Sequence, residues 1–283
     1  MHRTANVRSR LFRNRLFEIL VFVPGILVTV PFLLVLYHVI AKGIQVINWN
    51  LLFSLPKPVG EVGGGIANAI VGTITVVIIA AIVSVPIGVS AGIYLSESRK
   101  SRLAGITRMA ANLLQSVPSI VIGIVMYSWI VVPLRSFSGF AGGIALAVMM
   151  FPVIVKSTEE TVNLVPSGLK EASMALGARY HVTILRIVIP TSLSGILSGI
   201  TLAGARVAGE TAPLLFTAFG SPFFNFNIFK PVGAVPLVIY DYAKSPYDNW
   251  IQLAWGASFV LIALVLALNL VVRLIKLVHR GYQ

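Results

Sequence analysis

The chain of 283 residues contains no cysteine, only nine acidic residues and only four histidines. Without cysteine there is no disulfide framework, no thiol nucleophile and no thiolate metal site. The histidines, His2, His38, His181 and His279, are too widely spaced in the sequence to indicate a metal cluster. Charged residues make up 11% of the chain, against about 25% in soluble domains. These absences exclude a soluble globular protein. With 57% hydrophobic residues and a mean hydropathy of +0.91, the composition predicts an all-α polytopic membrane protein.

Six apolar stretches are long enough to cross a bilayer, which needs about 20 residues of helix because the membrane core cannot satisfy free backbone groups. We place them near residues 17–41, 66–95, 110–134, 140–157, 191–219 and 251–272. The fourth is the shortest, and its Gly and Ala content favours a helix packed among neighbours. A basic stretch precedes the first, but that apolar run is longer than the roughly 7–15 residues of a secretory signal core. We therefore expect it to be a retained span.

The net charge of +13 is explained by its distribution along the chain. In a soluble protein such an excess would indicate nucleic-acid binding, but 16 of the basic residues fall on one side of the six spans and five on the other. The larger set is Arg3, Arg8, Arg10, Arg13, Arg15, Arg99, Lys100, Arg102, Arg108, Lys156, Lys170, Arg179, Arg186, Arg273, Lys276 and Arg280; the smaller is Lys42, Lys57, Arg135, Lys230 and Lys244. The positive-inside rule predicts that both termini and the loops 96–109 and 158–190 are cytoplasmic.

Arg206 and Glu210 are charges within the fifth apolar stretch. At the bilayer centre each charge costs about 2.5–3.5 kcal/mol on insertion scales, so we expect both to have partners. Their i, i+4 spacing places them on one helical face, where they can pair. The chemistry leaves two roles open. The pair fixes helix packing, or Arg206 holds an anion through its guanidinium group while Glu210 positions or screens it.

A smaller polar set lies near the inner end of the third stretch and consists of Gln115, Ser116 and Ser119. Ser116 and Ser119 are one helical turn apart if the helix continues through Pro118, and they then could face a cavity. Ordinary hydrogen bonding between helices is the alternative. On the outer side, residues 220–250 are rich in aromatics, which fits either an interfacial belt or a docking surface for an external partner.

The loop 158–190 carries a spaced motif. Pro166 and Ser167 can start a helix, Gly177 can end it, and a second short segment is expected to end at Pro190. The motif consists of Glu171-Ala172-Ser173, then Gly177, then Ile187-x-Ile189-Pro190. It resembles the EAA loop of ABC-importer permeases, with Ser173 and Ile189 where the family has Ala and Leu. The alternative is that Gly177 and Pro190 merely punctuate a short loop.

The resemblance implies a coupling helix that docks on a separate ATP-hydrolysing subunit. This chain has no Gly-Lys dipeptide and hence no Walker A loop, so ATP and Mg would be bound by partner subunits and the chain itself would be neither an enzyme nor a cofactor protein. The residues that the resemblance assigns to coupling are Lys170, Glu171, Ala172, Ser173, Gly177, Ile187 and Pro190. At the position of Lys170 the family would have Arg, so a bidentate role there is not expected.

A second stretch is more specific. It reads Arg206-x-x-Gly209-Glu210-Thr211-Ala212-Pro213-Leu214-Leu215-Phe216-Thr217-Ala218 and resembles the signature of A-type permeases of phosphate ABC importers. The likeness extends from about residue 66 and includes 115–121 and Ser245-Pro246. It implies a type I ABC-importer permease architecture and phosphate as cargo. It also implies a homologous second permease, two ATPase subunits and an extracytoplasmic phosphate-binding protein. Its substrate pathway would include Arg206, Glu210, Thr211, Gln115, Ser116 and Ser119.

We therefore expect a six-span permease subunit of the cell inner membrane, in contact with lipid and not with nucleic acid. Residues 1–65 would hold a basic cytoplasmic terminus, the first span and an outer loop. Residues 66–272 would form the permease core with its coupling loop at 158–190, and 273–283 a cytoplasmic tail. A permease for another oxyanion, such as sulfate or phosphonate, is the nearest alternative. An ATP-independent channel or a membrane scaffold is a more distant one.

Overall fold

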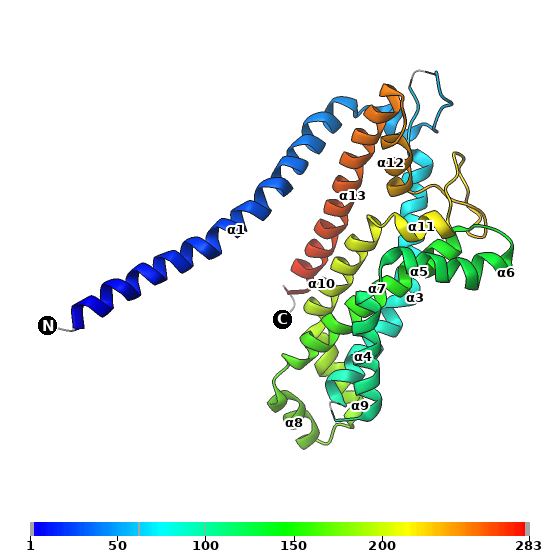
Figure 1. Ribbon diagram of the computed structural model, residues 1–283. Helices are drawn as coiled ribbons and strands as arrows, with labels where there is room; N and C mark the ends of the chain where they lie inside the picture. Colours follow the sequence, from blue (N-terminus) through cyan, green and yellow to red (C-terminus); the bar gives the residue numbers. More distant parts are fainter. Residues whose placement is uncertain (1–2, 62, 99, 281–283) are drawn as a thin grey trace.

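The computed structural model describes residues 3–61, 63–98 and 100–280 as an elongated bundle of helices (Figure 1). In chain order the helices are α1 (Arg3–Val46), α2 (Trp49–Phe53), α3 (Ala67–Glu97), α4 (Arg102–Ser116), α5 (Ser119–Met126), the π-helical turn η1 (Tyr127–Val131), α6 (Val132–Leu134), α7 (Gly139–Asn163), α8 (Ser167–Ala175), α9 (Tyr180–Thr183), the π-helical turn η2 (Ile184–Val188), α10 (Ile189–Ala208), α11 (Ala212–Thr217), α12 (Val235–Ala243) and α13 (Asp248–Arg280). Among the described residues, β-structure is limited to one isolated bridge between Phe219 and Val232. The expected all-α class is confirmed.

Within the part of the chain that the structure describes, five helices are long and apolar enough to cross a membrane: α1, α3, α7, the continuous run from α9 to α10, and α13. The bent pair formed by α4 and the segment from α5 to α6 is a sixth when it is counted as one span. The stretches predicted near 17–41, 66–95, 140–157 and 251–272 correspond to α1, α3, α7 and α13. The tail predicted at 273–283 begins inside α13, and residues 281–283 lie outside the described part, as does Arg99 of the inner basic set.

The third predicted span, near 110–134, is formed by a bent pair of helices and not by one continuous helix. α4 ends at Ser116, α5 begins at Ser119, and the two parts are bent by 103°. Val117 has an extended backbone, with φ −69° and ψ 128°, because the following proline ring disfavours the helical conformation of the residue before it. Ser116 and Ser119 would lie one turn apart only on an uninterrupted helix. They instead belong to two different helices.

The fifth predicted span, 191–219, is wrong at both ends. The segment does not stop at Pro190, since α9 continues through the π-helical turn η2 into α10, and Pro190 lies inside this continuous run directly after the π-helical turn. At the other end α10 finishes at Ala208, Gly209 caps it, and α11 is a separate short helix. Arg206 and Glu210 therefore lie on the two sides of a helix end and not inside one helix.

α7 is the central helix of the bundle and packs along α3. Glycines permit the close approach: a Cβ built on Gly92 would lie 2.6 Å from the Cβ of Thr158, and one on Gly143 would lie 2.4 Å from Cγ2 of Ile79. Of the 18 residues that form the most apolar stretch of α7, 67% are buried, whereas none of the corresponding residues of α1 is buried. The prediction that the fourth span packs among neighbours is confirmed.

α1 diverges from the rest of the bundle and meets it near its C-terminal end, where it packs on α13 (Figure 1). There Gly43 lies against Phe259, and the Lys42 ammonium group is 5.0 Å from the centre of the Trp255 ring. Most of the remaining apolar surface of α1 is exposed. A helix that is apolar all round requires lipid or another protein around it.

Candidate functional site

Arg206 and Glu210 lie where the fifth span breaks. Arg206 is in the last turn of α10, where the helix dipole favours a cation, and Glu210 follows the Gly209 cap. The Arg206 Nε and Glu210 Oε1 atoms are 3.8 Å apart, so the two residues form the ion pair that their spacing predicts. The Arg206 side chain is 52% exposed and that of Glu210 22% exposed. Because the contact is long and the guanidinium group is half exposed, Arg206 keeps donors for a second anion.

The helix break is held in place by α5. Thr211 is the half-buried residue before α11, and Pro213 occupies the first turn of that helix. α11 packs on α5, where the glycine Gly123 faces Pro213. The breaks in the third and fifth spans thus bring two short helices together beside the Arg206–Glu210 pair.

The predicted polar set of the third span is dispersed by the bend at Pro118. Gln115 and Ser116 are exposed at the end of α4, and the Ser116 hydroxyl donates to the Leu113 carbonyl of its own helix at 2.8 Å. Ser119 is half buried at the start of α5. The three side chains therefore belong to two differently oriented helices. In the described part of the chain they do not form one shared polar face.

The coupling motif forms a short helix with a defined end. α8 starts after Pro166, as predicted, and ends in a Schellman motif: the Gly177 N–H donates to the Met174 carbonyl at 2.9 Å and the Ala178 N–H to the Ser173 carbonyl at 3.2 Å. Gly177 has φ +83°, which an L side chain rarely adopts. The turn sends the chain back into α9.

One face of α8 points away from the bundle and the other is tied to α9. Glu171, Ala172, Met174 and Leu176 are exposed, and Leu176 is 90% exposed. The hydroxyl groups of Ser173 and Thr183 are 2.9 Å apart and both residues are buried. The residue that departs from the family's Ala thus fixes α8 on α9. Of the other motif residues, Ile187 is half buried in η2 and Pro190 is exposed.

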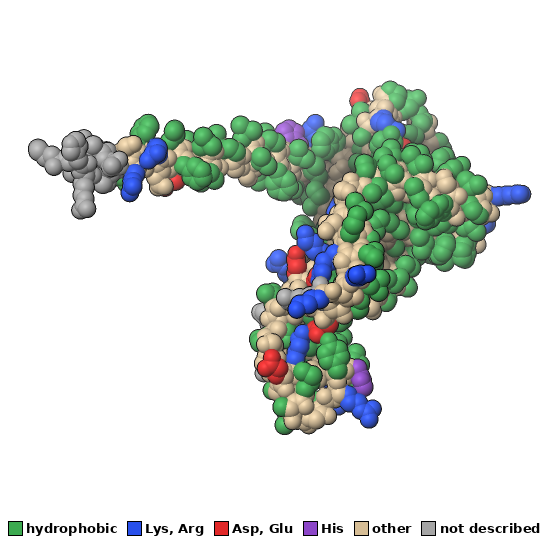
Figure 2. Space-filling view, turned by 60° about the horizontal axis from the view of Figure 1, so that its bottom comes forward, with side chains coloured by type: hydrophobic (Ala, Val, Ile, Leu, Met, Phe, Trp, Pro, Cys, Tyr) green, Lys and Arg blue, Asp and Glu red, His purple; other side chains and the backbone are tan. Residues whose placement is uncertain are grey.

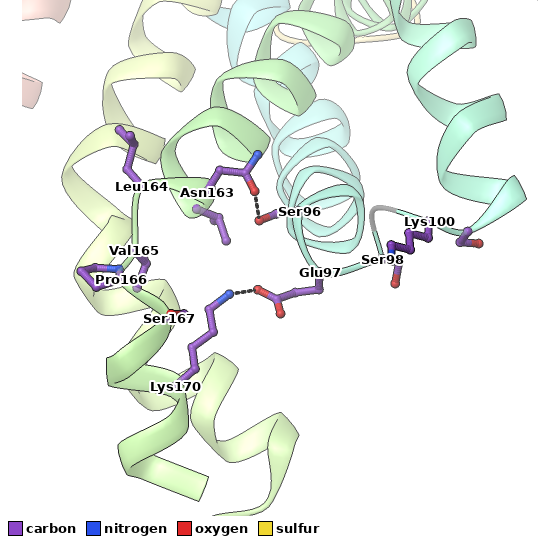
Figure 3. Close-up of a pocket in the computed structure, with 12 residues that line it drawn as sticks. Ser96, Glu97, Ser98, Lys100, Asn163, Leu164, Val165, Pro166, Ser167 and Lys170 are labelled. Atoms are coloured by element: carbon purple, nitrogen blue, oxygen red, sulfur yellow. Dashed lines mark hydrogen bonds and ion pairs between the residues drawn. The ribbon is translucent and has the colours of Figure 1, made fainter.

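Lys170 turns back toward the bundle and forms an ion pair with Glu97 at the end of α3 (Figure 3). The Tyr180 hydroxyl on α9 donates to the other oxygen of the same carboxylate, Oε2, at 2.6 Å. The Lys170 and Glu97 side chains are only 21% and 14% exposed. Lys170 therefore contacts the helix bundle, whereas its neighbour Glu171 is exposed.

A second ion pair joins α4 to α7. The Arg108 Nε donates to Glu159 Oε1 at 2.7 Å, and Arg108 Nη2 donates to the Leu95 carbonyl of α3 at 2.8 Å. The Ser96 hydroxyl also donates to Asn163 Oδ1 at 2.6 Å. α3, α4 and α7 are thus joined by polar contacts, which are stronger where the surroundings exclude water.

Charged side chains gather at one end of the molecule. Figure 2 shows Lys, Arg, Asp and Glu over the end that carries α8 and α9, while much of the remaining visible surface is hydrophobic. This separation is typical of a chain whose middle faces lipid and whose charged end faces water.

The aromatic segment 220–250 combines buried and exposed aromatics. The Tyr242 and Trp250 rings stack with centroids 4.6 Å apart beside a cavity of about 640 Å³. Burial, and then the neighbouring Asp241 carboxylate, raise the pKa of the Tyr242 phenol, so it stays neutral. Phe223 and Phe226 are exposed. The segment therefore has an ordered base and an aromatic outer surface.

Sequence reasoning missed Glu97, Tyr180, Arg108 and Glu159. A signal for Glu97 was available, since the chain has only nine acidic residues and this one ends an apolar span among inner basic residues. Its partners lie 73 and 83 positions away, and no spacing rule connects residues at that separation.

In the described residues, a bundle of five or six candidate spans with an exposed helix and turn at its charged end defines a polytopic helical membrane protein. The chain belongs to the family described as "Binding-protein-dependent transport system inner membrane component", which matches residues 84–280. It is thus a permease subunit of the inner membrane, as the EAA-loop resemblance implied.

Curated relatives extend the match to most of the chain. The "Phosphate transport system permease protein PstA" of Yersinia pestis is 41% identical over 242 residues, which is 85% of this chain and 82% of that protein. The protein of the same name from Haemophilus influenzae is 42% identical over 241 residues, with 85% of each chain covered. "Phosphate transport system permease protein PstA 1" of Mycobacterium tuberculosis is 35% identical over 284 residues, covering 98% of this chain and 92% of that protein.

Among solved structures, a chain of the inward-facing MetNI methionine ABC transporter has the same fold. The TM-score is 0.59 at 20% identity, and the superposition covers 77% of this chain and 94% of that chain. The expected ABC-importer permease architecture is therefore confirmed for the fold.

Proposed function

We propose that this chain is the membrane-spanning permease subunit of an ATP-driven importer that moves inorganic phosphate into the cytoplasm. The observation that carries the proposal is the likeness to relatives from three organisms, each aligned over 85% or more of this chain and each named as a phosphate transport permease. Residues 66–272 act as the permease core, and both termini are cytoplasmic. The inner excess of basic residues supports this orientation.

The importer contains partners that supply what this chain lacks. A homologous second permease completes the pathway, a cytoplasmic ABC ATPase dimer binds ATP and Mg, and an extracytoplasmic phosphate-binding protein delivers the cargo. Docking of the ATPase on α8 is supported by the exposed Glu171, Met174 and Leu176. Helices that present apolar and charged side chains in this way fit a groove on a soluble partner.

Arg206 is the proposed phosphate-binding residue of the pathway. Its guanidinium group has a planar set of donors that matches phosphate oxygens, and the 3.8 Å contact with Glu210 leaves donors available. When no cargo is present Glu210 screens the cation. When phosphate arrives, it takes the guanidinium donors that Glu210 leaves free, and repulsion between the two anions weakens the Arg206–Glu210 contact. Thr211, next to Glu210, belongs to the same proposed route, and Gln115, Ser116 and Ser119 would reach it only in the complete importer.

The test is Arg206→Ala in the complete importer reconstituted in vesicles, with Arg102→Ala as a matched control. Arg102 is an exposed arginine of α4 without an ion pair among the described residues. We expect ATP-driven phosphate uptake to fall at least tenfold for Arg206→Ala and to stay within twofold for the control. Undiminished uptake by Arg206→Ala would remove Arg206 from the pathway. Competition by sulfate or phosphonate stronger than by phosphate would assign another oxyanion as cargo.

A further inference from the structure

Glu97 is the last residue of α3, and its carboxylate lies at the inner end of the bundle core. The side chain is 14% exposed, and the helix dipole disfavours a carboxylate at a helix C-terminus. A carboxylate in such a place stays ionised only when cations or hydrogen-bond donors compensate it. The identity of those donors therefore indicates what the residue does.

Two donors to Glu97 come from the coupling segment. Lys170 on α8 pairs with Oε1, and the Tyr180 hydroxyl on α9 donates to Oε2 at 2.6 Å. α8 and α9 lie on the two sides of the turn at Gly177. One carboxylate thus holds both arms of the coupling turn.

The contact crosses a gap. A cavity of about 710 Å³ lies between the end of α3 and the linker from α7 to α8, and Lys170 reaches across it to Glu97 (Figure 3). The main packing partners of α8 are α9 and η2. Around this cavity the Lys170–Glu97 pair is therefore a discrete bridge and not one contact within a packed interface.

The chain itself joins α8 to α7 on one side and, through α9 and η2, to α10 on the other. α3 has no such covalent connection to α8, although it is the helix on which α7 packs. A displacement of α8 can be transmitted to α10 along the backbone. Its transmission to the end of α3 depends on side-chain contacts. Glu97 is the residue of α3 that can transmit this displacement, because it contacts both α8 and α9.

We propose that Glu97 is a positioning residue of the transport cycle that clamps both arms of the coupling turn to α3, so that movement of α8 is passed to α3 and α10 together. The proposal rests on the docking of the ATPase on α8 given above. An ion pair with a structural role alone would alter stability when broken but would leave the number of phosphate ions moved per ATP unchanged. That ratio is the discriminating measurement.

The experiment uses the complete importer in vesicles and measures phosphate uptake and ATP hydrolysis in the same preparation. We expect Glu97→Gln to lower the phosphate moved per ATP at least tenfold, and Tyr180→Phe to lower it about two- to fivefold. The matched control is Glu160→Gln, at an exposed carboxylate of α7 that has no ion pair among the described residues. It should keep the ratio within twofold. A wild-type ratio for Glu97→Gln overturns the proposal.

A charge exchange covers the case in which single variants fail to assemble. Glu97→Lys alone places two cations together and should abolish coupling, whereas Glu97→Lys combined with Lys170→Glu should recover at least a third of the wild-type ratio. An assembled double variant that remains uncoupled shows that Lys170 acts elsewhere, and it overturns the proposal.

A cross-link separates this inference from the docking on which it rests. Since the chain has no cysteine, Ala172→Cys on the exposed face of α8 gives a single attachment point for a cross-linker to the ATPase. If no cross-link forms in either the wild-type or the Glu97→Gln background, the docking itself is wrong. If both backgrounds cross-link and Glu97→Gln leaves the phosphate moved per ATP unchanged, the docking of the ATPase on α8 is supported and the proposed role of Glu97 is wrong.

Discussion

Gly123 on α5 lies so close to Pro213 on α11 that a Cβ built on the glycine would fall 2.8 Å from the Cα of the proline. The atom that it would meet belongs to the backbone, so no rotation of a side chain can relieve the contact. This approach seats α11, and with it the segment that carries Glu210, against the outer half of the broken third span.

Gly123→Val should therefore displace α11 and reduce both stability and transport. Overpacking of this kind costs about 1–3 kcal/mol, and we expect a lower melting temperature of the purified complex together with weaker phosphate uptake. Gly105→Ala on α4 is the control, since nothing lies within 4 Å of a Cβ there and alanine favours the helix by about 0.5–1 kcal/mol. Equal stability of the Gly123→Val and Gly105→Ala complexes would mean that α11 can shift away from α5 without a measurable loss of stability.

The sequence predicts where the spans lie but not where they break. Span length follows from bilayer thickness, which is why four of the six stretches correspond to long helices. Proline alone does not mark a break, because Pro86 and Pro152 lie inside the continuous helices α3 and α7, whereas Pro118 separates α4 from α5. Whether a proline interrupts a span depends on whether the helix ends at the break find other helices to pack against, as α5 does with α11. That is a tertiary property.

Arg206→Lys should retain the charge at the break yet lose most of the transport. Lysine cannot present the planar pair of donors that matches a phosphate, so we expect uptake to fall about tenfold while assembly and melting temperature stay near those of the wild type. Arg135→Lys, at the exposed outer end of α6, should leave uptake unchanged. Full activity of Arg206→Lys would mean that only the positive charge is needed, and fork-like recognition of the anion would be wrong.

Gly177→Ala should misplace the coupling helix without touching the pathway. At φ +83° an alanine is disfavoured by about 1–2 kcal/mol, so the Schellman motif that ends α8 should loosen. We expect phosphate uptake to fall several-fold in vesicles that contain equal amounts of the complex. Gly168→Ala in the first turn of α8 has open space around its Cβ and should behave as the wild type. Equal uptake by both variants would show that the turn tolerates the change.

The coupling segment shows how far a motif alone can predict a site. The spacing predicts the start of α8 and its end at Gly177, because both depend on local backbone preferences. It does not predict that Lys170 faces Glu97 or that Ser173 meets Thr183, because those contacts depend on how α9 folds back. The unusual residues of the motif are thus the ones that bind it to the rest of the chain.

Arg108 and Glu159 provide the test of how the inner ends are held. Arg108→Met leaves the Glu159 carboxylate, which is 16% exposed, without its 2.7 Å partner and leaves the Leu95 carbonyl without that donor. We expect a loss of about 1–3 kcal/mol, seen as a lower melting temperature of the complex. Adding Glu159→Gln removes the uncompensated charge, so the double variant should melt above Arg108→Met. If the two changes were instead additive, the pair would have no coupling energy, and the joining of α4 to α7 would rest on their apolar contacts alone.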